Sequence, residues 1–127
     1  MVQRLDQGLA VAAADVLPPQ VDRELLTVLR SVPVLIHNNG LAMAATYLLS
    51  KAKQANADDR YWKVAHKLLE EAAAVIRLDL ESGDPLRVLD ALIKAPNENY
   101  VVAQRRAQEL AVWMSRIGSA RKAPGDD

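Results

Sequence analysis

Residues 33–51 read PVLIHNNGLAMAATYLLSK, and they predict two helices joined by one tight break. Gly40 tolerates the left-handed backbone conformation that ends many helices, and Asn38 or Asn39 can cap a helix end with its side chain. Beyond Gly40, apolar side chains recur at the spacing of a single helix face: Leu41, Ala44, Ala45, Leu48, Leu49 and Ala52. We therefore expect a sharp turn at Gly40, followed by a central helix whose core-facing side chains are mostly small.

The composition favours one all-α domain. The chain has 127 residues, of which 50% are hydrophobic, and it contains no phenylalanine. Alanine and leucine dominate its apolar content, which suits closely packed helices better than a β-sheet core. A chain of this length can bury one core but not two. We expect a single helical domain over residues 1–122 and a disordered tail over residues 123–127.

Helical periodicity and breaks at proline and glycine predict a compact bundle of five or six helices. The second helix carries Pro33 inside it, where we expect a kink. Asp84 and Asn97 are the expected N-caps of the last two helices. In the short helix after Asp84, we expect Leu86 and Ile93 to be buried together with the other leucines. The predicted helices span about residues 2–16, 20–40, 41–52, 59–81, 85–94 and 97–121.

The sequence lacks the features of secreted and membrane proteins. It contains no cysteine, which excludes disulfides and thiolate chemistry. The first residues carry charges within an amphipathic pattern, unlike a signal peptide. No window holds the roughly 18 uninterrupted apolar residues that a membrane span requires. These observations predict a cytoplasmic protein without membrane contact.

The charge is balanced overall but unevenly distributed. A formal net charge of zero argues against binding of duplex DNA by bulk electrostatics, because such domains are usually basic. Residues 51–67 nevertheless carry a net charge of +3, residues 68–100 of −4 and residues 101–122 of +4. We therefore expect an electrically two-sided molecule.

Motifs for catalysis, metal binding and cofactor binding are almost absent. His37 and His66 are the only histidines, and His66 with Glu70 is spaced to ligate a metal from one helix face. The same pair is equally typical of an ordinary exposed contact, and no second ligand pair accompanies it. There is no glycine-rich phosphate loop and no nucleophile elbow. We expect no metal, no cofactor and no enzyme, with a small metal-dependent hydrolase as the least favoured alternative.

The two helices around Gly40 could also form a DNA-binding helix-turn-helix. The helix after the break begins Leu41-Ala42-Met43-Ala44-Ala45, which offers almost no side chain able to read base edges. A structural corner is therefore the favoured interpretation.

The last predicted helix carries a more suggestive surface. Arg105, Glu109 and Arg116 lie along one stripe away from the predicted core, with Arg106 and Trp113 on the neighbouring stripe. Arginine and tryptophan recur at binding hot spots, so this surface could hold a nucleic-acid backbone or a protein partner. Burial of Trp113 in the core is an equally good interpretation.

Two segments together resemble the signature regions of the small subunit of the type III-B CRISPR effector, the Cmr complex of the RAMP module. The first region is similar in its proline, apolar pair, Asn-Gly-Leu and final Ser-Lys, which are residues 33, 35–36, 39–41 and 50–51 here. The second is similar in Tyr100, Trp113-Met114, Arg116 and Ala120. The chain departs from the family pattern at Tyr47, where the family favours Phe, at Ser115, where it favours Lys, and at Gln104 and Arg106, where it tends to Thr and Glu. These departures bear on the RNA-facing residues more than on the family assignment.

The resemblance implies a non-catalytic, all-helical subunit of an antiviral defence complex. Such a subunit stacks along the backbone of a crRNA-guided assembly and helps to line the path of the target RNA. The implied partners are the backbone and large subunits, neighbouring copies of the chain itself, and the crRNA and target RNA. The alternative is a helical adaptor that binds only protein.

Basic clusters give the candidate RNA contacts. Lys63 and Lys67 lie four residues apart, and Arg105 adjoins Arg106, so each pair repels unless an anion lies nearby. Phosphates contacted without regard to base identity would supply that anion. The predicted RNA-binding residues are Lys51, Lys53, Lys63, Arg105, Arg106 and Arg116.

Overall fold

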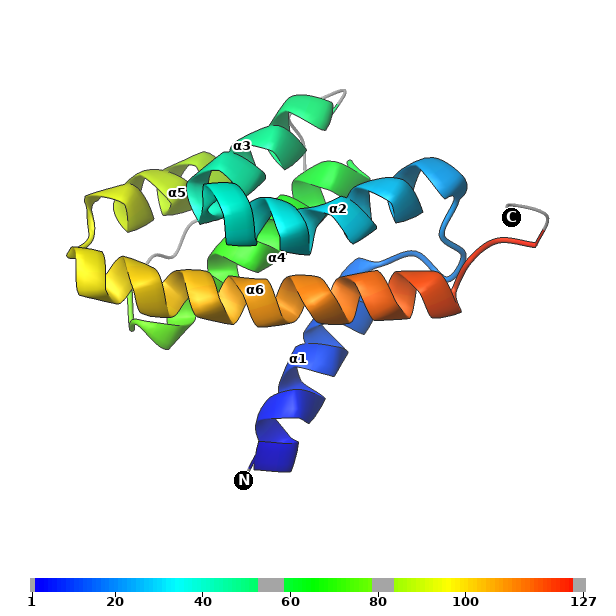
Figure 1. The fold of residues 1–127 in the computed structure, drawn as a ribbon, viewed down its shortest axis with the longest axis horizontal. Helices are drawn as coiled ribbons and strands as arrows, with labels where there is room; N and C mark the ends of the chain where they lie inside the picture. The colour runs from blue at the N-terminus through cyan, green and yellow to red at the C-terminus, as the bar shows by residue number, and fades with distance from the viewer. Residues whose placement is uncertain (1, 53–58, 79–83, 125–127) are drawn as a thin grey trace.

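The computed structural model describes residues 2–52, 59–78 and 84–124, with side chains from residue 7 onward. Within these residues the chain forms six α-helices and no β-strand, which confirms the all-α prediction (Figure 1). None of these helices combines the length and the apolar content needed to cross a membrane. The helices are α1 (Val2–Val16), α2 (Arg23–Asn39), α3 (Leu41–Lys51), α4 (Arg60–Val75), α5 (Pro85–Lys94) and α6 (Asn97–Ala120).

Helix α6, rather than the helix after Gly40, is the centre of the fold. It has 24 residues and packs against α2, α4 and α1, whereas α3 packs chiefly against α2 and α4, and α5 against α4. In Figure 1, α6 runs the length of the molecule beside α2, and α1 projects away from the other helices. The expectation of a central helix over residues 41–52 was therefore wrong. Among the described helices, only α6 contacts all five others.

Helices α2 and α6 run antiparallel in close contact. A Cβ atom on the buried Gly118 of α6 would lie 2.8 Å from Cδ1 of Leu29, so glycine lets the two helices approach there. At the other end of the contact, Nε2 of Gln108 donates to the carbonyl of Pro33 at 2.9 Å. Helix α2 continues through Pro33 as one element, as predicted, whereas the kink expected at Pro33 stays a prediction.

The corner between α2 and α3 is stabilised from α6. Gly40 has a φ of 94° and a ψ of 163°, so its φ is positive as expected but its conformation is not the left-handed helical one. Neither Asn38 nor Asn39 caps α3. Instead, the backbone N–H of Leu41 donates to Oε1 of Gln104, and that of Ala42 donates to the hydroxyl of Tyr100, both at 2.9 Å. Side chains about 60 residues away therefore satisfy the free amides of this helix start.

Three other helix ends differ from the prediction. Helix α2 begins at Arg23 rather than near residue 20, because Asp22 is its N-cap and accepts a hydrogen bond from Leu25 N at 2.9 Å. Helix α4 ends at Val75 in a turn where Arg77 has a φ of 59°, and the predicted continuation over residues 79–81 lies outside the described residues. Helix α6 is preceded by Pro96 as its N-cap rather than by Asn97. The predicted N-cap Asp84 is confirmed.

The core is built from leucine, alanine and valine, and the described residues include no buried polar or charged side chain. In α5, however, the buried residues follow helical spacing as Pro85, Val88, Leu89 and Leu92. Leu86 and Ile93 are instead 54% and 57% exposed, so their predicted burial was wrong. The apolar residues of α5 fit two overlapping helix faces, one with Leu86 and Ile93 and one with Val88. A helix of 10 residues has too few turns for the sequence pattern to show which of the two faces is buried.

The end of the chain is tied to the linker between α1 and α2. The guanidinium of Arg121 donates to the carbonyls of Ala14 at 2.9 Å and Leu17 at 3.1 Å. The N–H of Val21 donates to the Arg121 carbonyl, and the N–H of Ala123 donates to the Val21 carbonyl. These four hydrogen bonds fix where α1 leaves the bundle.

Candidate nucleic-acid interface

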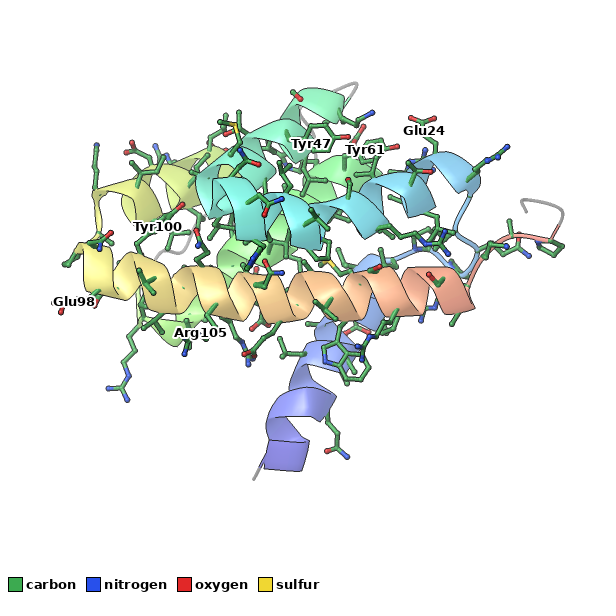
Figure 2. All side chains as sticks on the ribbon, viewed as in Figure 1. Glu24, Tyr47, Tyr61, Glu98, Tyr100 and Arg105 are labelled. Atoms are coloured by element: carbon green, nitrogen blue, oxygen red, sulfur yellow. The ribbon has the colours of Figure 1, made fainter. Side chains whose placement is uncertain are left out.

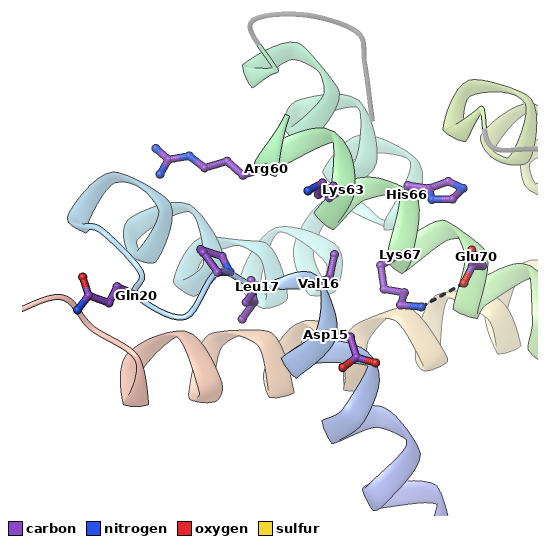
Figure 3. Close-up of a pocket in the computed structure, with 10 residues that line it drawn as sticks. Asp15, Val16, Leu17, Gln20, Arg60, Lys63, His66, Lys67 and Glu70 are labelled. Atoms are coloured by element: carbon purple, nitrogen blue, oxygen red, sulfur yellow. Dashed lines mark hydrogen bonds and ion pairs between the residues drawn. The ribbon is translucent and has the colours of Figure 1, made fainter. Parts of the chain in front are cut away.

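A groove of about 650 Å³ lies between the end of α1 and helix α4 (Figure 3). One wall is formed by residues 15–18 and 20, and the other by α4, whose lining side chains share one face of the helix. We call this hollow the α4 groove. Its α4 side chains are Arg60, Lys63, His66, Lys67 and Glu70.

Arg60, at the rim of the α4 groove, joins the beginnings of α2 and α4. Its guanidinium forms ion pairs with Asp22 and with Glu24, the latter at 3.8 Å. The backbone hydrogen bond from Leu25 and then the hydrogen bond from Arg60 lower the pKa of Asp22 below the usual aspartate value of 3.8. The Tyr61 hydroxyl donates to Glu24 at 3.0 Å, and burial followed by this hydrogen bond raises the pKa of Tyr61. The geometry of this corner is therefore fixed by charge-assisted contacts.

A second groove, of about 470 Å³, lies between the first turns of α2 and the last turns of α3. We call it the α2–α3 groove. Lys51 extends over the ring of Tyr47, with its Nζ atom 5.6 Å from the ring centroid. Glu24 lines this groove and also pairs with Arg60, so the α2–α3 groove adjoins the α4 groove. Its lining residues are Arg23, Glu24, Thr27, Val28, Tyr47 and Lys51.

Arg105 lies on a different surface. It lines a hollow of about 240 Å³ with Ile36 and His37 at the end of α2, whereas the α2–α3 groove is at the beginning of that helix. At 1.5 Å per residue, the ten residues from Thr27 to His37 separate these two regions by about 15 Å. Figure 2 shows Tyr47 at the upper edge of the molecule and Arg105 below α6. The predicted RNA-binding residues therefore do not gather in one patch.

The predicted cations also differ in whether they are already paired. Lys51, Lys63, Arg105 and Arg116 are exposed and form no ion pair with any described residue. Arg106 is only 19% exposed and pairs with Glu71 of α4 at 3.3 Å. Lys53 lies outside the described residues.

A family model described as CRISPR-associated protein (Cas_Cmr5) matches residues 5–121. The chain belongs to this Cmr5 family. It is therefore of the type that forms the small subunit of the type III-B Cmr complex, as the resemblance implied. No curated protein and no solved structure shows significant similarity to it.

The two signature regions of this Cmr5-family chain meet in space. The first comprises the end of α2, the corner at Gly40 and α3, and the second lies on α6. They are joined where Tyr100 and Gln104 accept hydrogen bonds from the first amides of α3. Tyr100, a residue of the family pattern, thus stabilises the fold by accepting a hydrogen bond at the start of α3. Trp113 is half-buried against the core. It is therefore neither a fully exposed surface residue nor a fully buried core residue, the two alternatives that the sequence left open.

The histidines are not brought together in the Cmr5-family chain. His66 lines the α4 groove, and His37 lines the hollow that contains Arg105. Glu70, the carboxylate spaced to ligate with His66, pairs with Lys67 at 3.2 Å. Among the residues that the structure describes, there is no group of three or more metal-ligating side chains suited to hold an ion.

Sequence reasoning missed two basic residues of the grooves, Arg23 and Arg60. Each directly follows the aspartate that caps its helix, since Asp22 caps α2 and Asp59 caps α4. The sequence does contain a signal for Arg23, because Asp22 is a residue type that favours the N-cap position. An N-cap at Asp22 places Arg23 at the first helical position, next to Glu24.

Proposed function

We propose that this chain is a non-catalytic subunit that stacks along the backbone of the crRNA-guided complex and lines part of the target-RNA path. The observation that carries the proposal is the pair of adjoining grooves. Within them Lys51, Arg23 and Lys63 have no ion pair with described residues, and Arg60 lies between the grooves. Cations that form no ion pair can contact phosphates without first breaking an internal salt bridge.

The strength of the interaction follows from the number of unpaired cations. Three phosphate contacts to a single strand predict that the logarithm of affinity falls with the logarithm of salt concentration with a slope of about −2. A neutral protein with so few contacts binds RNA weakly and with little sequence preference. Binding tightens in the assembled complex, where stacked copies present their grooves to one strand.

Titration of a labelled single-stranded RNA with the full-length chain at several salt concentrations tests this proposal. The Lys51→Gln, Lys63→Gln double variant removes two phosphate contacts, so it should bind more weakly and reduce the salt slope by about 1.4. The matched control is Arg87→Gln, Lys94→Gln on α5, which removes the same charge away from the grooves. Equal losses in both double variants, or no loss in the groove variant, would refute the proposal.

The protein-only adaptor is favoured by a different observation. Around Arg105, the exposed side chains include Val101 at 48% exposure, and Val34 on α2 is 59% exposed. Such apolar side chains suit contact with another protein subunit. The Arg105→Glu, Arg116→Glu variant shows which of these two roles the α6 surface has. If it assembles but loses affinity for target RNA, α6 belongs to the RNA path. If it binds RNA normally but fails to assemble, the α6 surface holds a protein partner.

The non-catalytic assignment has its own test. Labelled RNA incubated with the chain, with and without divalent metal, should remain intact. Cleavage that disappears in a His37→Ala, His66→Ala variant would show that the chain is an enzyme.

A further inference from the structure

We infer that the α2–α3 groove binds one unstacked base of the RNA, with the base against the ring of Tyr47 and the adjoining phosphates at Arg23 and Lys51. This inference rests on the proposed RNA-binding function and adds to it a specific contact with a nucleobase. The volume of about 470 Å³ lies within the range of about 300–1,000 Å³ that is usual for small-molecule sites.

Tyr47 differs from the two other tyrosines in the use of its hydroxyl group. The Tyr61 hydroxyl donates to Glu24, and the Tyr100 hydroxyl accepts from Ala42 N. The Tyr47 hydroxyl forms no hydrogen bond with any described residue. Its ring is half-buried, so one part packs against the core while the rest lines the groove. The fold thus holds this ring firmly and leaves part of it available as a stacking surface.

The charges around the ring favour a base inside the groove and phosphates at its rim. Glu24 lines the groove with a negative carboxylate, which repels a phosphate but can accept a hydrogen bond from a base N–H. Lys51 and Arg23 are exposed cations beside the same ring. Lys51 is held over the ring only by a cation–π contact at 5.6 Å, so it can turn toward a phosphate when a base replaces it.

This combination of one aromatic ring and flanking cations is the usual composition of sites for single-stranded nucleic acid. The α4 groove differs because its lining residues include no tyrosine, tryptophan or phenylalanine, and the imidazole of His66 offers a smaller ring than that of Tyr47. We therefore assign base contact to the α2–α3 groove and backbone contact alone to the α4 groove.

The test compares the full-length chain on two oligonucleotides, a single-stranded RNA and an otherwise identical strand that lacks all bases. Wild type should bind the strand with bases about tenfold more tightly, since stacking on one aromatic ring contributes that much. Tyr47→Leu keeps apolar contact with the core but lacks the aromatic face, so it should bind both strands with nearly equal affinity. Tyr47→Phe should behave as wild type. All three proteins should show the same dependence on salt, because no charge changes.

The outcomes separate this inference from the proposed function. If wild type binds both strands equally, or if Tyr47→Leu still distinguishes them, the base-stacking site is refuted. The RNA-binding function nevertheless stands in that case, provided that Lys51→Gln, Lys63→Gln weakens binding. If wild type binds neither strand, both are refuted. The comparison of the two strands with wild type requires no variant to fold.

Photocrosslinking gives an independent test of the site. RNA that contains 5-iodouridine should form a covalent crosslink to Tyr47 on irradiation, and crosslinks confined to other residues would contradict the assignment.

Discussion

Replacing Tyr100 by phenylalanine should destabilise the fold although the ring is retained. The Tyr100 hydroxyl accepts a hydrogen bond from Ala42 N at 2.9 Å, and this amide belongs to the first turn of α3. Without the hydroxyl, a half-buried N–H loses its partner. Loss of a helix cap costs about 0.5–2 kcal/mol, and we expect about 1 kcal/mol because Ala42 retains some access to water.

The second cap at the same helix start should cost somewhat more. Gln104→Leu leaves the N–H of the fully buried Leu41 without its acceptor, so we expect a loss of about 1–2 kcal/mol. The two substitutions act on adjacent amides, so their effects need not be additive.

Urea unfolding followed by circular dichroism measures these changes, and thermal unfolding should shift by roughly 3–5 °C per kcal/mol for a chain of this size. Tyr47→Phe is the matched control, because it removes a hydroxyl that has no hydrogen bond with a described residue. If Tyr100→Phe is as stable as wild type, or no less stable than Tyr47→Phe, the cross-helix cap does not stabilise α3.

Two further predictions concern stability. Gly118→Ala should lower the free energy of unfolding by about 1 kcal/mol, because overpacking against Leu29 exceeds the gain in helix propensity. Gly8→Ala on α1 is the control, since a Cβ atom there meets no neighbouring atom. It should raise the free energy of unfolding in the same urea titration. The lowered pKa of Asp22 contributes stability that is present above about pH 4 and is lost as the pH falls through its folded value. Asp22→Asn should therefore narrow the difference in urea midpoint between pH 6 and pH 3, and an unchanged difference would contradict this.

Helices were predictable wherever a local pattern decides them. The long periodic stretches of α1 and α4, and the aspartate cap at Asp84, depend on neighbouring residues only. The start of α2 was misplaced because Val21 continues the apolar stripe but pairs with the end of the chain. The caps of α3 were missed because they come from α6. Contacts between distant residues leave no periodic signal in the sequence.

The same reasoning explains the outcome for the candidate site. Sequence spacing places Lys63 and Lys67 on one face, and both indeed line the α4 groove. It cannot reveal that Arg106 pairs with Glu71, which is 35 residues away, or that Arg60 pairs with Asp22. Which cations remain available for RNA is therefore decided by tertiary contacts. The candidate role of Tyr47 likewise depends on the packing of α3 against α2, which places its ring in one groove with Arg23 and Glu24.

The ties between Arg121 and the α1–α2 linker bear on how the chain folds during synthesis. Helix α1 leaves the bundle at Ala14 and Leu17, whose carbonyls accept from a side chain 107 and 104 residues later. Helix α1 also packs on α6, which begins only at Asn97. Its docking during synthesis must therefore wait until Arg121 has left the ribosome, since contacts so distant in sequence form late. Until then, α1 lacks most of the surface against which it packs.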